Sequence, residues 1–313
     1  MIFRGYSPGD ELAQSSIRSA FVRMYPDSSE RSPEAILAAI SEPDPEAVAH
    51  IYADDGWGVR GVIGLRADGR VSVPECLPGY EHLAPELIRQ ALKLAASRGL
   101  LQVVAVLPTH WHLEASFVGA GFVRVREIVS FAQTAMELPT VVGRFSPRIQ
   151  PISHADLSEI ETSIVRASAT GSLPAEFLEC LHRVSTHSSQ PPAILRRPDG
   201  TAMGVGWLVE NDDWPPIEVA DPFGCDLHVG TWGGEVRATV RVNGAFSFLA
   251  VSAFETVSVG LDLLARLVSE MNSVCIRTVC AQVPADASQL KSFYDRYFKR
   301  LATLSLFRCR VSP

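Results

Sequence analysis

The sequence has little positive charge and no long hydrophobic run. It contains 28 lysines and arginines against 35 aspartates and glutamates, a formal net charge of −7. Proteins that bind nucleic acid usually carry a basic stripe, and anionic membranes attract basic segments, so neither partner is expected. The longest apolar stretch, residues 99–108, is far shorter than the roughly 20 residues that a membrane-spanning helix needs.

No Cys-x-x-Cys pair occurs, and no leader segment is expected. The six cysteines are scattered and form no Cys-x-x-Cys pair, which argues against the common redox and zinc motifs. A chain of 313 residues can bury a core without cross-links, so we expect reduced, mostly buried cysteines. The N-terminal residues lack the basic-then-apolar order of a secretory signal. These absences predict a cytoplasmic protein.

The usual nucleotide, hydrolase and metal motifs do not occur. There is no Gly-x-x-x-x-Gly-Lys-Ser/Thr loop and no Gly-x-Ser-x-Gly elbow. Residues 56–61 match Gly-x-Gly-x-x-Gly, but a strand and not a helix follows, so a hairpin is expected. His110 and His112 flank Trp111 without further ligands nearby. We therefore expect a polar loop with an aromatic plug there, and no metal.

What the sequence does have is a long internal repeat. Residues 116–131 and 292–307 share the frame Ser-Phe, four residues, Phe, one residue, Arg, six residues, Phe. The same shift of 176 residues relates 103–108 to 279–284. Near the start, residues 3–10 match 149–156 at a shift of 146, with Ser7 over Ser153 and Asp10 over Asp156, so the second copy carries an insertion. A repeat unit of this length predicts two copies of one domain.

The repeat places the domain boundaries. Residues 139–147, which begin and end with proline, are predicted to link an N-terminal domain, 1–138, to a C-terminal domain, 148–313. Within each copy the residue patterns predict the order strand, helix, three strands, helix, strand, helix, strand. The predicted fold class is α/β of the α+β type, with two similar domains, each a mixed, mostly antiparallel sheet flanked by helices.

This element order, together with the sequence FVGAGF (residues 117–122) before the last strand, resembles the GNAT superfamily of acyl-CoA-dependent N-acyltransferases. The resemblance covers nearly the whole chain, as a tandem GNAT. It implies transfer of an acyl group from acetyl-CoA or another short acyl-CoA to a small-molecule amine.

The resemblance also implies where the cofactor binds. In the superfamily, the helix after the fourth strand begins at a gap between two strands, and its free amides hold the CoA diphosphate. The loop before it is written roughly Arg/Gln-x-x-Gly-x-Gly/Ala; the first copy has GYEHLA (79–84) and the second has ETVSVG (255–260). Glu255 would repel a diphosphate unless it points away. The second copy fits better, with the candidate residues Val251, Ser252, Ala253, Thr256, Val257, Ser258, Val259 and Gly260.

The catalytic acid is harder to assign. The superfamily often uses a tyrosine in Tyr-x-x-x-Gly-Phe, where this chain has Phe117 and Phe293. Tyr294 follows one residue later, about 100° around the helix, and Tyr297 shares the face of Phe293. Tyr294 is the catalytic candidate, and packing alone is the alternative for both tyrosines. The carboxylates of the insertion (208–238) are either the source of a general base or solvated turns.

Two functions therefore remain open. The first is an N-acetyltransferase whose second domain is the active half. The alternative is a non-catalytic binding or scaffolding protein, which the poverty of glycine in both loops favours. A monomer or a homodimer is expected, because duplication can bury within one chain a contact otherwise made between subunits.

Overall fold

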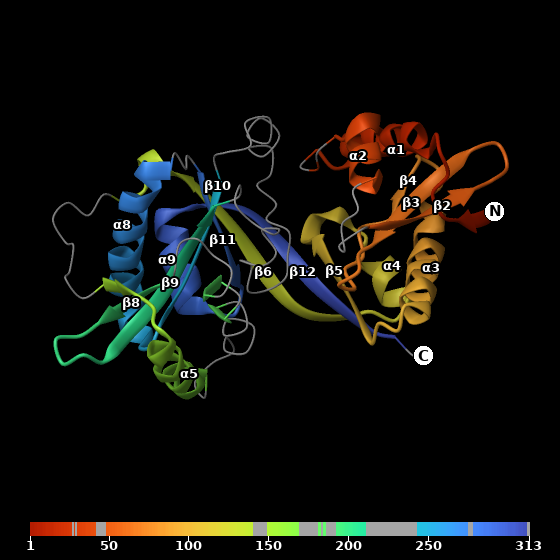
Figure 1. Ribbon diagram of the computed structural model, residues 1–313. Coiled ribbons are helices and arrows are strands. Elements are labelled where there is room, and N and C mark those ends of the chain that lie inside the picture. Colours follow the sequence, from red (N-terminus) through yellow and green to blue (C-terminus); the bar gives the residue numbers. More distant parts are fainter. Residues whose placement is uncertain are drawn as a thin grey trace. The chain divides into compact units, whose positions relative to one another are not determined.

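The computed structural model (Figure 1) describes residues 1–26, 28, 30–41, 48–139, 149–168, 181–182, 184–185, 192–210, 243–274 and 278–311. The predicted linker, apart from Pro139, lies outside the described residues. So does the predicted insertion from residue 211 onward, with the carboxylates expected there.

The described chain divides into two compact units. Unit 1 consists of Met1–Arg126 together with Leu304–Pro313, and unit 2 consists of Glu127–Thr303. Each unit thus contains most of one sequence copy and the final strand of the other. The elements agree with the predicted mixed α/β fold, except that the first copy has a second helix, Pro33–Ser41, before its second strand.

Unit 1 is built on an antiparallel sheet of four strands in the order β1-β2-β3-β4. An isolated parallel bridge pairs Arg70, in the connection between β3 and β4, with Val104 of β5. The elements are β1 (Ile2–Arg4), α1 (Asp10–Met24), α2 (Pro33–Ser41), β2 (Ala49–Asp54), β3 (Val59–Leu65), β4 (Glu75–Cys76), α3 (Ala84–Ser97), β5 (Gln102–Pro108) and α4 (Glu114–Gly119).

Unit 2 has strands in the order β6-β11-β10-β9-β8-β7, in which only β10 and β11 run parallel. Its elements, with β6 and β12 shared with unit 1, are β6 (Val123–Thr134), β7 (Ile149–Pro151), α5 (His154–Ser168), β8 (Ala193–Arg196), β9 (Ala202–Glu210), β10 (Asn243–Ala250), α8 (Thr256–Val274), β11 (Thr278–Pro284), α9 (Ser288–Tyr297) and β12 (Lys299–Arg310).

Helix α3 shows how the sequence pattern becomes local structure. Pro85 lies in its first turn, where a missing amide hydrogen costs nothing. Its apolar stripe, including Leu87, Ile88 and Ala91, is fully buried in the core of unit 1. Gly99 follows the helix with a φ of 72°, a left-handed conformation that glycine adopts without strain. The helix thus has a proline in its first turn and is followed by a glycine.

The last strands of the two copies are exchanged. In unit 1, β12 pairs with β5 and places Phe307 opposite Ala105; Figure 1 shows the blue end of β12 beside β5. In unit 2, β6 pairs with β11 and places Phe131 opposite Ala281. A shift of 176 residues converts one pairing into the other, so both strands use the same register.

The match between residues 3–10 and 149–156 is a repeated helix-start corner. The amide of Ser7 donates to Asp10 Oδ2 at 2.6 Å, and the amide of Ser153 donates to Asp156 Oδ2 at 2.7 Å. Each carboxylate fixes the turn that enters the first helix of its copy. The predicted alignment of these segments is confirmed.

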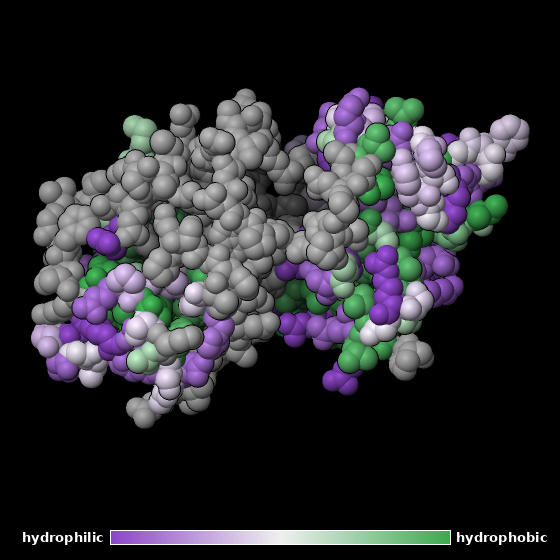
Figure 2. All heavy atoms as spheres, in the orientation of Figure 1, coloured by the Kyte–Doolittle hydropathy of each residue, from purple (hydrophilic) through white to green (hydrophobic). Residues whose placement is uncertain are grey.

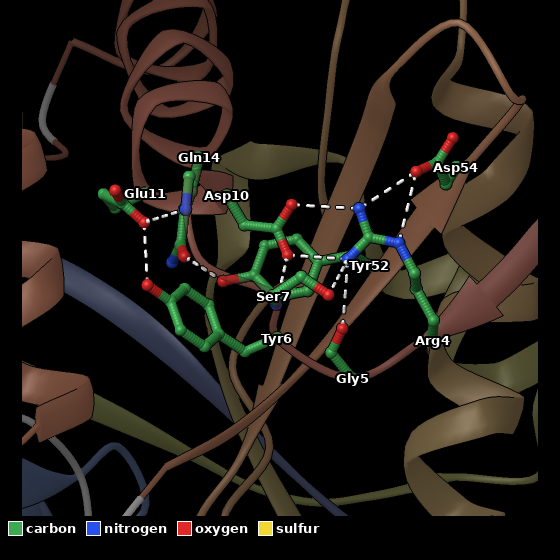
Figure 3. Close-up of polar contacts among 10 residues, drawn as sticks. Arg4, Gly5, Tyr6, Ser7, Asp10, Glu11, Gln14, Tyr52 and Asp54 are labelled. Atoms are coloured by element: carbon green, nitrogen blue, oxygen red, sulfur yellow. Dashed lines mark hydrogen bonds and ion pairs between the residues drawn. The ribbon is translucent and has the colours of Figure 1, made fainter.

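An arginine completes each corner. Figure 3 shows Arg4 between two carboxylates, with bonds to Asp10 at 2.7 and 2.9 Å and to Asp54 at 2.9 and 3.2 Å. Burial alone would raise the pKa of Asp10, but the hydrogen bonds from Arg4 and Ser7 hold that pKa below its usual value. In the second copy Arg196 pairs with Asp156. These charges anchor the first helix to the sheet in both copies.

The described surface offers no broad apolar face in the view of Figure 2, where hydrophobic and hydrophilic side chains are interspersed. None of the described helices is long and apolar enough to cross a membrane.

His50 on β2 gives unit 1 a specific pH dependence. Burial, with a smaller contribution from Arg31, lowers its pKa from 6.5 to about 4. The unfolded chain therefore takes up a proton near pH 6.5 that the folded chain refuses, so stability is present above that pH and is lost as pH falls toward 4. Between pH 7 and pH 5 the loss is about 2 kcal/mol.

Urea unfolding at the two pH values measures this loss. We expect His50→Gln to remove most of the difference and His110→Gln, on an exposed residue, to keep it. An unchanged pH dependence in the His50→Gln variant would assign the effect to other groups.

Candidate functional site

A gap opens between the neighbouring strands β10 and β11 of unit 2. Among the described residues they pair in parallel at three positions, the last being Ala245 with Cys280. Strand β10 continues to Ala250, still paired with β9, and β11 continues to Pro284, paired with β6. The two neighbours therefore diverge toward their carboxyl ends, the side of a parallel pair where ligands bind in α/β sheets.

Backbone groups of β10 face this gap. The amide of Val251 donates to Met203 O at 2.8 Å, which makes Val251 and Met203 a hydrogen-bonded pair in the antiparallel register of β10 and β9. Because peptide groups alternate along a strand, those of Phe246, Phe248 and Ala250 point away from β9 and toward the gap.

Helix α8 begins where the gap opens. A short 3-10 helix, Ala253–Glu255, follows β10, and α8 continues from Thr256. The first amides of a helix have no partner within the helix, so this end can attract an anion. Of the predicted cofactor residues, Val251, Ser252 and Val257 are half-buried, Thr256 is buried and Ser258 is exposed. Ala253 lies in the 3-10 helix between them.

The acidic residue expected to oppose an anion is neutralised. The Glu255 carboxylate forms an ion pair with Arg197, at 2.5 Å, from the hairpin between β8 and β9. Ser258 Oγ donates to the Glu255 carbonyl oxygen at 3.0 Å, which steadies the turn. The carboxylate is thus held by a cation and does not cover the helix amides as a free charge.

The end of the predicted loop belongs to the core. Gly260 lies one turn inside α8 and is buried. A Cβ at this position would approach Phe248 Cζ to 2.6 Å and Phe293 Cε2 to 2.7 Å. Its neighbour Val259 is also fully buried in the core of unit 2. The lack of a side chain at Gly260 therefore allows α8 to pack closely on the two aromatic rings. Of the predicted cofactor residues, those up to Ser258 are the ones that lie at the opening of the gap.

Tyr294 reaches the gap although its sequence position is one step from the expected one. Its hydroxyl donates to Phe246 O at 3.3 Å, a carbonyl just beyond the last β10–β11 pair. The residue is buried, and burial raises the pKa of its hydroxyl well above the usual value. Phe293 instead faces Phe248, with ring centroids 4.8 Å apart. Tyr297 packs at the edge of the core, 5.1 Å from the Phe293 ring.

The equivalent helix start in unit 1 is covered by its own side chain. The Glu81 carboxylate accepts a hydrogen bond from the amide of Gly79 at 3.0 Å. Its own backbone amide and that of Gly79 lower the pKa of Glu81. A negative charge therefore already lies on the loop before α3.

In unit 1, side chains of helix α1 contact residues in β4 and just after β5. Arg18 forms an ion pair with Glu75 of β4, where burial nevertheless raises the pKa of the carboxyl. Trp111, just after β5, is buried; its ring centroid lies 5.3 Å from that of Phe21, and its carbonyl oxygen accepts a 2.6 Å bond from Tyr25. The predicted aromatic plug is confirmed.

The described cysteines are buried thiols. Cys76, Cys280 and Cys309 are free and buried, and burial raises the pKa of Cys76 and of Cys280 to about 12, so both hold their protons. Among the described residues, no group of three or more histidine, cysteine, aspartate or glutamate side chains could hold a metal ion.

Comparison with known proteins identifies the fold. No protein-family model and no curated protein matches the sequence. Among solved structures, a GCN5-related N-acetyltransferase (GNAT) from Sphaerobacter thermophilus matches 100% of this chain and 96% of its own, at 17% identity and a TM-score of 0.61. A tandem GNAT protein from the clavulanic acid biosynthesis pathway matches 100% of this chain and 99% of its own, at 11% identity and a TM-score of 0.55.

A third match covers only part of the other protein. A GCN5-related glucosamine N-acetyltransferase region of a fungal multi-domain β-N-acetylglucosaminidase covers 98% of this chain at 12% identity and a TM-score of 0.62, but only 38% of that protein is matched. At these identities the likeness concerns the fold. The chain therefore has two GNAT-like domains, as its repeat predicted.

Proposed function

We propose that this protein is an N-acetyltransferase that transfers an acetyl or other short acyl group from acyl-CoA to a small-molecule amine, and that unit 2 is its active half. The observation that carries the proposal is the divergence of β10 and β11 directly in front of the start of α8. A gap lined by strand backbone and closed by helix amides suits an extended ligand that ends in a diphosphate.

Two sets of backbone groups would bind different parts of acyl-CoA. The peptide groups of Phe246 and Phe248 would hydrogen-bond the amides of the pantetheine arm, as a further strand would. The first turn of α8, at Val257 and Ser258, would receive the diphosphate. Together they hold the thioester carbonyl in one place, so a neutral amine needs only to be positioned for attack.

Tyr294 is proposed to protonate the thiolate that departs. Its raised pKa keeps the phenol protonated at neutral pH, and its hydroxyl already lies at the narrow end of the gap. A small rotation would exchange the Phe246 carbonyl for sulfur as acceptor. A proton donor within hydrogen-bond reach of a developing charge contributes typically about 10²–10⁴-fold to a rate.

A scaffolding role is favoured by two observations in unit 1. There Glu81 covers its own loop amide and α1 links β4 and β5. We propose that unit 1 binds no acyl-CoA and serves as scaffold. The same role for the whole chain is the alternative to catalysis.

Thermal unfolding with acetyl-CoA tests the proposal. At 100 times its dissociation constant, the ligand is expected to add about 2.7 kcal/mol to the free energy of unfolding. Ser258→Glu should remove this gain, because an exposed first-turn carboxylate occupies the α8 amides while leaving the helix stable.

His82→Glu is the matched control, since the 176-residue shift relates His82 to Ser258 and both are exposed. It should keep the full gain. The reverse result would move the active half to unit 1, and no gain with any short acyl-CoA would leave the scaffolding alternative.

A further inference from the structure

The loop before α8 lacks a cation of its own. The position at which GNAT loops begin with arginine or glutamine holds Glu255. The structure supplies a cation from elsewhere, because Arg197 lies 58 residues earlier in the chain and still contacts the Glu255 carboxylate. A positive group therefore lies beside the helix start without being part of the loop.

The hairpin that carries Arg197 is held firmly in place. The amide of Arg197 donates to Thr201 O at 2.8 Å, and Asp199 accepts bonds from the Thr201 amide and hydroxyl at 2.9 and 2.7 Å. Because β9 pairs antiparallel with β10, bringing Gly204 opposite Ala250, this turn lies at the carboxyl end of β10. The same end of β10 leads into α8.

The Arg197–Glu255 pair is poised to exchange partners. The side chains are 35% and 30% exposed, and an ion pair this close to water contributes little to stability. A diphosphate carries more charge than a carboxylate, accepts bidentate bonds from a guanidinium, and gains from the α8 amides at the same time.

We propose that Arg197 binds the diphosphate of acyl-CoA, and that Glu255 holds its guanidinium beside the site until the ligand arrives. This inference rests on the proposed function, since it assigns a cation to the same site. Glu255 then acts as a competitor that weakens binding, and Arg197 as a direct ligand of the phosphate oxygens.

A double-mutant cycle on the dissociation constant of CoA, measured by calorimetry, tests both roles. Arg197→Ala should raise the Kd about 10-fold or more, because the phosphate loses a charged hydrogen bond and faces an unpaired carboxylate. Glu255→Gln should lower the Kd about 3-fold, because it frees Arg197. The double variant should bind about 10-fold more weakly than Glu255→Gln alone.

That last comparison decides the inference. If Arg197 only neutralised Glu255, the double variant would bind CoA as tightly as Glu255→Gln, and the direct role would be refuted. Arg89→Ala, which removes an arginine paired with Glu86 at 3.0 Å in α3 of unit 1, is the control and should leave the Kd unchanged. Absence of CoA binding by the unmodified protein would refute the proposed function itself, and with it the inference.

Discussion

Replacing Phe307 with alanine is expected to destabilise unit 1 by about 3–5 kcal/mol, although Phe307 belongs to the last strand of the chain. The side chain is fully buried in the core of unit 1 and stacks on Phe117, with centroids 6.2 Å apart. Its removal leaves a cavity between α4 and the sheet that the surrounding strands cannot close.

Phe131→Ala is the matched variant, because the 176-residue shift relates the two phenylalanines. Phe131 is fully buried in the core of unit 2 and stacks on Tyr294, with centroids 5.5 Å apart. The same loss is expected, but in unit 2. Each substitution should therefore weaken the unit that contains most of the other sequence copy.

Hydrogen exchange measured segment by segment tests whether the last strands are exchanged between the two sequence copies. Phe307→Ala should reduce protection in β5 and α3, and Phe131→Ala in β11 and α9. If each variant instead loosened its own sequence copy, the last strands would not be exchanged, and each unit would consist of a single copy.

The sequence predicts the repeat that makes the exchange of the last strands possible, but it does not predict the exchange itself. Phe131 and Phe307 occupy the same place in one frame, and each meets an alanine, Ala281 or Ala105, at the same register. Either strand therefore fits either sheet. Local patterns fix the strand and its register, whereas the choice of partner depends on how the chain connects the two units, which no periodicity records.

The cofactor site stays a prediction, and the structure shows which of its predicted residues lie at the gap and which lie in the core. A small residue at Gly260 has two explanations, close approach of a phosphate or of a ring, and only the positions of Phe248 and Phe293 show that the ring explanation applies. Arg197 could not be found from a local motif, because its partner Glu255 is distant in sequence. The Pro-Asp-Gly turn at 198–200 was the available signal, since it predicts a hairpin next to the fourth strand.

The tyrosine assignment illustrates the same limit. Helical geometry alone places Tyr294 about 100° from the position expected of a catalytic side chain. In the structure, Phe293 is directed at Phe248 and Gly260, which turns the next residue toward β10. The rotation of α9 is set by this packing, so the orientation of the hydroxyl follows from tertiary contacts and not from spacing.

Tyr294→Phe is expected to lower kcat about 100-fold while costing about 1 kcal/mol of stability. The phenyl ring retains its contacts with Phe131 and Phe246, so the change removes only the hydroxyl and its bond to the Phe246 carbonyl. Without that proton, the thiolate departs as an anion inside an apolar gap, which raises the barrier to collapse of the tetrahedral species.

Steady-state turnover of acetyl-CoA with the best amine of a panel, followed by thiol release, measures the effect, and Tyr297→Phe serves as the control with unchanged kcat. A Tyr294→Phe protein with normal kcat and a small loss of stability would reduce Tyr294 to a packing residue. A fall in kcat without a rise in KM, in contrast, is the signature of a group that acts only in the transition state. The large fall in kcat therefore identifies a catalytic role. The loss of one buried hydrogen bond lowers the free energy of unfolding by about 1 kcal/mol and does not selectively reduce turnover.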